Sequence, residues 1–289
     1  MKIIDIIKSK KPVLGFEIFP PKQNTPIETI YNSLEKFKAL NPDYISVTYG
    51  AGGSTKRNTI DVASKIKSEY GIESMAHFTC VCHQEEEIDN LLEIMSEEGL
   101  ENILALRGDP PRDKPDYDFT GCAYRYASDL VRHIHSKNKF CIAAAAYTEG
   151  HVESARILDD IKHLKIKVDH GVDFLITQLF FDNRLYFDFV ERISDHGISC
   201  PVMPGIMPVF AADQIKTMCL RSGCSIPAKL VLLMDKYSGN PDDMLKAGIE
   251  YAAEQISELI ENGAPGIHLY TMNRPVSTRK ILRAANLLS

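Results

Sequence analysis

Short apolar runs alternate with amphipathic segments along almost the whole chain. Eight of the runs have the β-branched and aromatic composition of strands, and turn residues bound them. Between the runs, apolar residues recur every three or four positions, as they do on one face of a helix. The eight predicted strands cover residues 13–19, 44–49, 73–79, 102–106, 140–147, 174–180, 201–206 and 267–271. Such alternation is typical of parallel strands joined by right-handed helical crossovers.

The helices are predicted to fall between these strands and after the last one. They cover residues 25–40, 55–70, 84–98, 124–136, 152–170, 183–196 and 277–287, with a short amphipathic helix at 1–8. Eight such units close into a (β/α)8 TIM barrel of the α/β class. We therefore predict one barrel domain over residues 1–289, with extra helices between strands seven and eight. A doubly wound open sheet is the alternative, but no Gly-x-Gly-x-x-Gly or Walker-type loop follows any strand.

Composition narrows the function classes. The chain of 289 residues is 44% hydrophobic and 25% charged, as expected for a soluble globular protein. Its net charge of −6, without a long basic block, argues against nucleic acid or an anionic membrane as partner. No apolar run approaches the roughly 20 residues that span a bilayer. Seven cysteines, an odd number, suit reduced thiols and predict a cytoplasmic protein.

Glu17 is the chemical anomaly of the first predicted strand. It is the single carboxylate in an otherwise apolar run that ends at Pro20 and Pro21. Burial of a carboxylate disfavours its charged form and raises its pKa. Glu17 is therefore a candidate general acid near neutral pH. The alternative is a strand whose Glu17 side chain faces solvent.

The carboxyl ends of the strands form the active-site face of a TIM barrel. Almost every predicted strand delivers a polar or titratable residue to that face. These residues are Glu17, Thr48, Tyr49, His77, Arg107, Gly108, Asp109, Tyr147, Gln178, Pro204, Gly205 and the segment 270–274. The ring favours an enzyme or a ligand-binding barrel over an interaction scaffold.

Other motifs in the chain leave two readings open. The glycine-rich segment 50–54 is able to cradle a phosphate or is simply a tight turn. The Arg-Gly-Asp segment 107–109 is either part of a functional site or a surface turn. Residues 80–83, Cys-Val-Cys-His, lack the Cys-x2-Cys spacing of structural zinc sites, so we predict no metal. His151, His163 and Lys167 fall on one predicted helix at spacings of twelve and four residues, so they could share a functional face or belong to ordinary solvated surface.

Eight segments, taken in order, resemble the methylenetetrahydrofolate reductases, in the short bacterial form without the regulatory domain of eukaryotic members. They are FEIFPP (16–21), VTYG (47–50), HFTC (77–80), LALRGD (104–109), YASDL (126–130), ITQLFF (176–181), PGI (204–206) and YTMNR (270–274). The resemblance covers nearly the whole chain. It implies a barrel in which reduced FAD gives a hydride to methylenetetrahydrofolate.

The resemblance also implies roles for individual residues. Glu17 matches the acid that protonates the bridging nitrogen of the folate and opens its five-membered ring. Asp109 matches the acid that faces folate and flavin. Residues that match FAD contacts are Thr48, Tyr49, Ala51, His77, Leu106, Arg107, Gly108, Asp109, Tyr126, Ala127, Tyr147, His151, Ser154, Asp160, His163 and Lys167. Residues that match folate contacts are Glu17, Asp109, Gln178, Gln214 and Arg274.

Two positions depart from the family pattern. Thr148 follows Tyr147 where the family often has proline, and Met218 stands where bacterial relatives can have an aromatic residue that stacks on a planar ligand. The electron donor, NAD(P)H or another compound, is left open, as is the formation of a homo-oligomer. Two alternatives also stay open: a metal- or Schiff-base-dependent lyase barrel, and a catalytic subunit that takes electrons from a partner protein.

Overall fold

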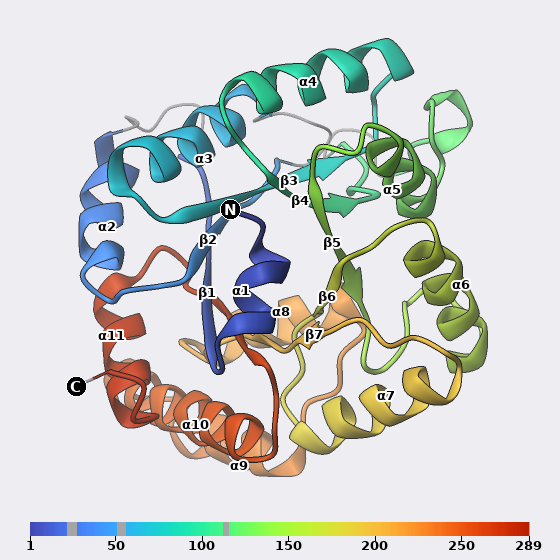
Figure 1. Ribbon diagram of the computed structural model, residues 1–289. Coiled ribbons are helices and arrows are strands. Elements are labelled where there is room, and N and C mark those ends of the chain that lie inside the picture. Colours follow the sequence, from blue (N-terminus) through green and yellow to red (C-terminus); the bar gives the residue numbers. More distant parts are fainter. Residues whose placement is uncertain (22–27, 51–55, 112–115, 289) are drawn as a thin grey trace.

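The computed structural model describes residues 1–21, 28–50, 56–111 and 116–288. Within these residues the strands form one parallel sheet, in the order β7-β6-β5-β4-β3-β2-β1-β9-β8 (Figure 1). The strands are β1 (Val13–Ile18), β2 (Tyr44–Val47), β3 (Glu73–Thr79), β4 (Asn102–Leu106), β5 (Cys141–Ala146), β6 (Phe174–Thr177), β7 (Val202–Met203), β8 (Gly205–Ile206) and β9 (Gly266–Tyr270). Each coincides with a predicted strand or with part of one.

The ring closes through a strand that is broken in two. β7 pairs with β6 and β8 pairs with β9, which in turn pairs with β1. Pro204, which has no N–H to give to the ladder, separates the two pieces. Its carbonyl still accepts a hydrogen bond from the His268 N–H at 2.9 Å. The predicted (β/α)8 barrel is confirmed, and β7 with β8 together make its seventh strand.

Helices surround the barrel, as the periodicity predicts. They are α1 (Ile3–Ser9), α2 (Glu28–Lys38), α3 (Lys56–Tyr70), α4 (Glu85–Glu97), α5 (Ala127–Ser136), α6 (Ile157–Asp169), α7 (Asn183–Asp195), α8 (Ala212–Ser222), α9 (Ala228–Lys236), α10 (Pro241–Glu261) and α11 (Pro275–Ala284), with a 3-10 turn, η2, at Phe119–Gly121. The extra helices predicted between the seventh and eighth barrel strands are α8, α9 and α10, which lie between β8 and β9. The prediction was wrong about where α6 begins, because residues 152–156 form turns and bends and not a helix.

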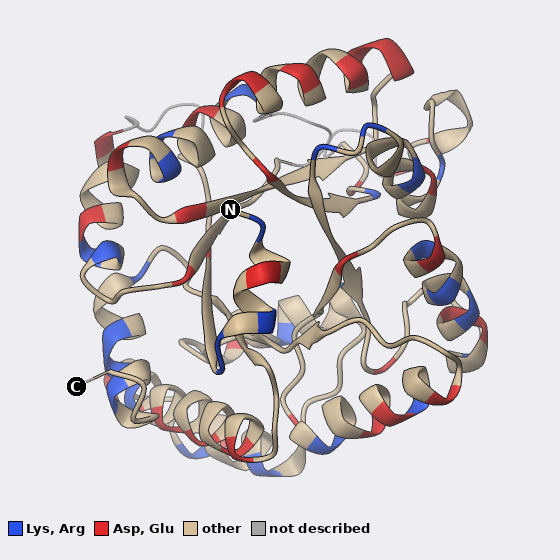
Figure 2. Cartoon of the chain, viewed as in Figure 1, with Lys and Arg blue, Asp and Glu red and all other residues tan. Residues whose placement is uncertain are grey.

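The outer helices bury one face against the sheet and expose the other. On α7, for example, Tyr186, Phe189 and Ile193 are buried, at spacings of three and four residues. Burying each such side chain contributes roughly 1.5–3 kcal/mol to folding. Lys, Arg, Asp and Glu residues are found mostly on the surrounding helices and loops and few lie on the strands (Figure 2). None of the described helices combines the length and the apolarity needed to cross a membrane.

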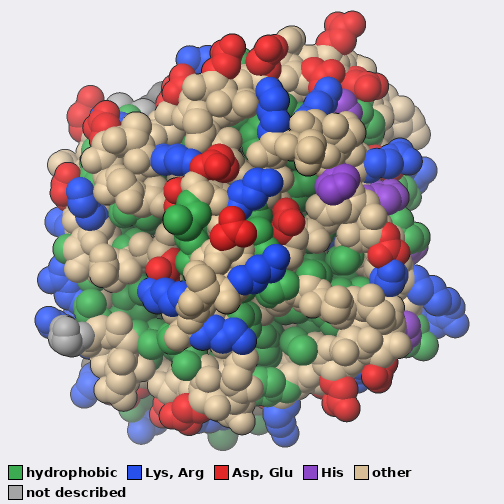
Figure 3. All heavy atoms as spheres, in the orientation of Figure 1, with side chains coloured by type: hydrophobic (Ala, Val, Ile, Leu, Met, Phe, Trp, Pro, Cys, Tyr) green, Lys and Arg blue, Asp and Glu red, His purple; other side chains and the backbone are tan. Residues whose placement is uncertain are grey.

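The interior of the barrel is apolar at the amino-terminal ends of the strands. Val13, Met75, Leu104 and Phe174 meet there, and Ile3, Ile4 and Ile7 of α1 pack against them. Helix α1 lies across this end of the barrel, in the centre of Figure 1. The space-filling view shows side chains of both charge signs over this face (Figure 3). Helix α1 therefore covers the amino-terminal end of the barrel.

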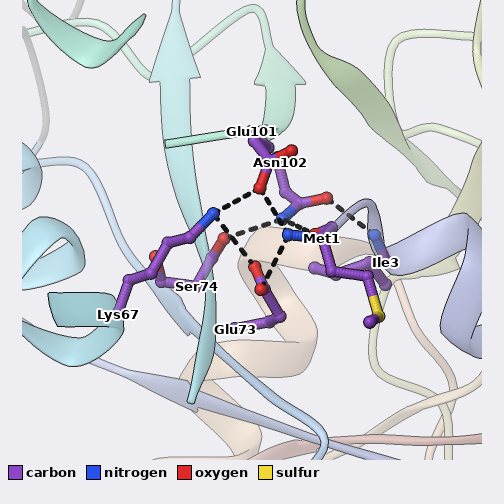
Figure 4. A network of polar contacts seen from close by, with 7 residues as sticks. All are labelled: Met1, Ile3, Lys67, Glu73, Ser74, Glu101 and Asn102. Atoms are coloured by element: carbon purple, nitrogen blue, oxygen red, sulfur yellow. Dashed lines mark hydrogen bonds and ion pairs between the residues drawn. The ribbon is translucent and has the colours of Figure 1, made fainter. Parts of the chain in front are cut away.

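A polar network attaches the start of the chain to β3 and β4 (Figure 4). The Ile3 N–H donates to Asn102 Oδ1 at 2.8 Å, and the Met1 amino group lies 2.8 Å from Glu73 Oε1. Glu101 forms ion pairs with both that amino group and the Lys67 ammonium. These contacts hold α1 in place over the amino-terminal end of the barrel.

Candidate active site

Glu17 lies inside the barrel near the carboxyl end of β1. Because strand side chains alternate, Gly15 and Glu17 share the inward face with Val13. The Glu17 residue is only 7% exposed, so its side chain is buried and not solvent-facing. Its backbone carbonyl accepts hydrogen bonds from Thr271, from the hydroxyl at 2.7 Å and from the N–H at 3.2 Å. The strand thus holds a carboxylate in a protein interior.

Two imidazoles approach the same oxygen of that carboxylate. His77 Nε2 lies 3.4 Å and His268 Nε2 lies 3.3 Å from Glu17 Oε2. Burial, opposed by the negative charge of Glu17, lowers the pKa of His77 to about 4, so this imidazole is neutral at pH 7. Among the described residues, neither Lys nor Arg pairs with Glu17, and Oε1 accepts no hydrogen bond. One oxygen is therefore engaged and the other is left for a ligand.

His268 and Tyr44 belong to this cluster although the sequence analysis did not select them. The Tyr44 hydroxyl lies 2.9 Å from His268 Nδ1, and both side chains are fully buried. Burial raises the pKa of Tyr44, so it stays a phenol at neutral pH. The signal was present in the sequence, because His268 interrupts an apolar strand just as Glu17 does.

The loops after β1 and β9 are locked to each other beside Glu17. The Asn273 amide group both donates to the Phe19 carbonyl and accepts from the Phe19 N–H, each at 2.9 Å. Met272 and Asn273 adopt left-handed backbone conformations, with φ of 52° and 54°. Asparagine tolerates this conformation better than most residues. The arrangement fixes the chain that follows the Glu17 strand.

A second cluster lies where β4 ends. The Arg107 guanidinium holds the Glu153 carboxylate through two hydrogen bonds of 2.7 Å, and it lies 5.1 Å above the Phe119 ring. The hydrogen-bonded carboxylate raises the pKa of Arg107. Gly108 has a φ of +89°, and a Cβ there would come within 2.5 Å of Val81. Glycine is therefore required at this position. The segment 107–109, which the sequence left open as a site or a surface turn, is a loop that packs closely against Val81.

The loop after β5 supplies the next part of the second cluster. The rings of Tyr147 and His151 meet edge to face, with centroids 4.7 Å apart. Because α6 begins at Ile157, His151 lies in this loop and does not share a helix face with Lys167. Burial is the main cause that raises the pKa of Tyr147, to about 12, and that lowers the pKa of His151. The Ser154 hydroxyl donates to Asp160 at 3.1 Å.

Lys167 points from α6 toward the sheet. Its ammonium donates to the Ala145 carbonyl on β5 at 2.5 Å, and the residue is partly buried. Burial lowers the pKa of Lys167 to about 8, and the nearby Asp160 opposes that change. His163, by contrast, is exposed on the outer side of α6. Lys167 and His163, both predicted FAD contacts, therefore have different environments, one against the sheet and the other exposed to solvent.

Tyr270 lies next to the Glu17 cluster at the carboxyl end of β9. Its hydroxyl donates to the Thr177 carbonyl at 3.0 Å, and its ring lies beside His268. Burial is the main cause that raises the pKa of Tyr270, and the negative charge of Glu17 adds to it. Asp109 is exposed, and it also lies near enough to Tyr147 to influence its pKa.

Other predicted cofactor contacts lie around the same end of the barrel. Tyr49 follows β2 with its hydroxyl 3.3 Å from His83 Nε2, and the Thr48 carbonyl accepts from the Thr59 hydroxyl at 2.9 Å. Leu106 is partly buried at the end of β4. Tyr126, half exposed, and Ala127 begin α5, and no contact places them in either cluster. Ala51 and the segment 51–55 lie outside the described residues.

The three predicted folate contacts besides Glu17 and Asp109 come from separate segments of the chain. The Gln178 side chain, after β6, accepts from the Leu179 N–H at 2.8 Å. Gln214 and Met218 face each other on α8, with Nε2 to Sδ at 3.9 Å. The exposed Arg274 lies 4.8 Å above the Phe210 ring. In the described part of the chain, no group of three or more His, Cys, Asp or Glu side chains could hold a metal ion.

Comparison with known proteins matches nearly the whole chain to one family. Residues 2–286 match the profile of the family "Methylenetetrahydrofolate reductase". The chain belongs to this family. It is 36% identical over 282 residues to methylenetetrahydrofolate reductase 1 of Schizosaccharomyces pombe, covering 96% of this chain and 47% of the relative. It is 34% identical over 303 residues to methylenetetrahydrofolate reductase (NADH) 1 of Arabidopsis thaliana, covering 100% and 51%.

The relatives in this family differ in length. The chain spans about half the length of these eukaryotic relatives. A bacterial relative, the 5,10-methylenetetrahydrofolate reductase of Pectobacterium carotovorum, is 32% identical over 263 residues, with 90% of this chain and 86% of the relative covered. Among solved structures, an uncharacterized Clostridium thermocellum protein that binds two copies of 5-methyl-5,6,7,8-tetrahydrofolic acid superposes with a TM-score of 0.67. It is 16% identical and covers 99% of this chain and 98% of its own. That similarity shows the fold alone.

Proposed function

We propose that this chain reduces 5,10-methylenetetrahydrofolate to 5-methyltetrahydrofolate, with FAD as its cofactor and NAD(P)H or another compound as electron donor. The observation that carries the proposal is Glu17, a buried carboxylate at the carboxyl end of the barrel with one engaged and one available oxygen. Membership of the methylenetetrahydrofolate reductase family supports it. The Pectobacterium relative, which this chain nearly spans, supports the same reaction.

The second cluster fits a dinucleotide cofactor. Lys167 is a cation whose hydrogen-bond partner is a neutral backbone carbonyl, so it gains from an added anion. The two Arg107 N–H groups that hold the Glu153 carboxylate are also able to hold phosphate oxygens. Gly108 keeps the β4 end free of a side chain. These residues, with Tyr147 and His151, suit FAD and its charged pyrophosphate.

The chain's own residues would handle the proton and the orientation of the substrate. Bound FAD, once reduced, supplies the hydride. Glu17, protonated, would donate to the bridging nitrogen of the folate, so that the five-membered ring opens and the methylene carbon becomes electrophilic. The carboxylate of Asp109 would stabilise the positive charge that then develops on the folate. Gln178, after β6, and Arg274, after β9, would bind the folate at the mouth of the barrel.

FAD loading and turnover together test the proposal. The purified protein, incubated with FAD and freed of excess, is expected to retain about one flavin per chain and to show its yellow absorbance. An anaerobic screen of NADH, NADPH and low-potential dyes then identifies the donor, and chromatography of the folates detects 5-methyltetrahydrofolate. A protein that retains no flavin refutes the cofactor. A flavoprotein that any of these donors reduces, yet that leaves methylenetetrahydrofolate unchanged, refutes the reaction.

A further inference from the structure

We propose that Tyr44 is a positioning residue that holds His268 in the tautomer with its proton on Nε2. His268 then donates to Glu17 Oε2, and the proton that Glu17 gives to its substrate is carried by Oε1. The catalytic consequence rests on the proposed function, whereas the tautomer is a property of the protein alone. The argument starts from the contacts of the Tyr44 hydroxyl.

The Tyr44 hydroxyl has a single described partner. It lies 2.9 Å from His268 Nδ1, in a fully buried environment, and the two rings are stacked with a 21° interplanar angle. The phenol keeps its proton at neutral pH, so it is able to donate to Nδ1. If Nδ1 carried the proton instead, the phenol hydrogen would be a buried donor without an acceptor, which is unfavourable.

The other side of the imidazole leads to the same tautomer. His268 Nε2 lies 3.3 Å from Glu17 Oε2. With the proton on Nδ1, the lone pair of Nε2 would face a lone pair of Glu17 Oε2. With the proton on Nε2, the nitrogen donates to that oxygen. Of the two neutral tautomers of His268, only the Nε2–H form satisfies both contacts, and Tyr44 and Glu17 together select it.

Gly15 makes room for this arrangement. A Cβ at Gly15 would lie 2.2 Å from Tyr44 Cζ and 2.4 Å from the Tyr44 hydroxyl oxygen. Gly15 is two residues before Glu17 on the same inward face of β1, and it pairs in register with Tyr44 on β2. The absence of a side chain there allows the phenol to pass over the strand and reach His268 on β9.

The proton of Glu17 is thereby confined to one oxygen. Oε2 is approached by both His77 and His268, and Oε1 accepts no hydrogen bond from the described residues. An acid proton placed on Oε1 is available to a ligand, whereas one placed on Oε2 would compete with the His268 donor. Tyr44 therefore acts on the reacting carboxyl group through His268, without touching the substrate.

The experiment measures the tautomer and the two half-reactions separately. Protein labelled with 15N-histidine is studied by NMR, and the His268 signals are assigned by their loss in His268→Gln. The unsubstituted protein is expected to show a protonated Nε2 and an unprotonated Nδ1 at His268. In Tyr44→Phe, which keeps the ring and removes the hydroxyl, we expect the Nδ1–H tautomer to gain population, because only the Glu17 contact then favours Nε2–H. Stopped-flow should show a folate half-reaction slowed roughly two- to tenfold, with flavin reduction unchanged.

Tyr186→Phe is the matched control. It also removes one buried hydroxyl, which donates to the Val202 carbonyl at 2.9 Å on the outer side of the sheet. It should change neither the His268 signals nor the folate half-reaction. An Nδ1–H tautomer in the unsubstituted protein overturns the proposal, and this measurement needs no variant to fold. An unchanged tautomer in folded Tyr44→Phe overturns it as well. Absence of folate reduction in the unsubstituted protein refutes the proposed function instead, and leaves the NMR result to decide the role of Tyr44.

Discussion

At the scale of single residues, the molecule separates Glu17, the proposed proton donor, from Arg107 and Lys167, the cations proposed to bind the cofactor. Glu17 is surrounded by imidazoles and phenols, with His77 held neutral at pH 7 by its burial. Arg107 and Lys167 lie in the second cluster, away from that carboxyl group. A cation next to Glu17 would favour its ionised form and make it a poorer acid. The distribution of charge suits a carboxyl group that must carry a proton.

Replacement of Glu17 by Gln tests this role. The side chain keeps its shape and its hydrogen-bonding capacity but loses the proton it would donate. The folate half-reaction is expected to fall by roughly 10²–10⁴, the usual contribution of general acid catalysis. Flavin reduction by the competent donor should stay within a few-fold, because it needs no protein acid. Stopped-flow of each half-reaction checks this. Equal loss of both steps would mean that Glu17 maintains the flavin site, and loss of neither would move the search for the acid to Asp109.

Lys167 allows a prediction with a defined pH dependence. Its pKa of about 8 in the free protein should rise when an anionic pyrophosphate binds beside it. FAD binding then takes up a proton above pH 8, so FAD affinity should decrease as pH rises from about 8 to 10.

Lys167→Ala should weaken FAD binding about ten- to hundredfold at pH 7 and flatten that pH dependence. Lys165→Ala is the control, because Lys165 lies on the same helix but pairs with Asp169. Flavin fluorescence titrations at several pH values provide the affinities. Equal dissociation constants for Lys167→Ala and the unsubstituted protein would assign Lys167 to structural packing.

The same physical reasoning explains which site residues the sequence revealed. Glu17 was found because a carboxylate inside an apolar strand is costly and therefore conspicuous. His268 presents a similar signal, but an imidazole is neutral without a partner, so its burial is less conspicuous. Tyr44 carries no signal at all, because tyrosine is common in buried strands. Its importance comes from the space over Gly15, which depends on the register between β1 and β2.

At the scale of elements, strand and helix periodicity predicted the order of the barrel, and local backbone chemistry set the details. Pro204 divides the seventh strand because it cannot donate to the ladder. The amphipathic pattern before Ile157 resembled a helix, but the structure has turns there, with the Ser154 hydroxyl bonded to Asp160. Such side-chain bonds compete with helix formation. His151 is therefore brought to the Tyr147 ring by a loop, which no helical spacing predicts.

At the scale of the whole molecule, the two ends of the barrel differ in character. The interior changes from Val13, Met75 and Leu104 at the amino-terminal end to Glu17 and His77 at the other. In TIM barrels the first kind of face supports stability and the second carries chemistry. A substitution in the polar network under α1 should therefore change stability without changing catalysis.

Glu101 is the residue for this test, because its carboxylate pairs with both Lys67 and the Met1 amino group, which lower its pKa to about 2. A lowered folded-state pKa gives stability that is present above the ordinary value of 4.5 and is lost as pH falls toward 2. Glu101→Gln should therefore lower the urea midpoint at pH 7, and its difference from the unsubstituted protein should shrink between pH 4.5 and 2.

FAD affinity and both half-reactions should stay unchanged, and Glu97→Gln, at the exposed end of α4, should change none of these quantities. A Glu101→Gln variant that keeps its midpoint at pH 7 would show that the network adds nothing to stability. A variant that folds but loses FAD would show that the two ends of the barrel are coupled.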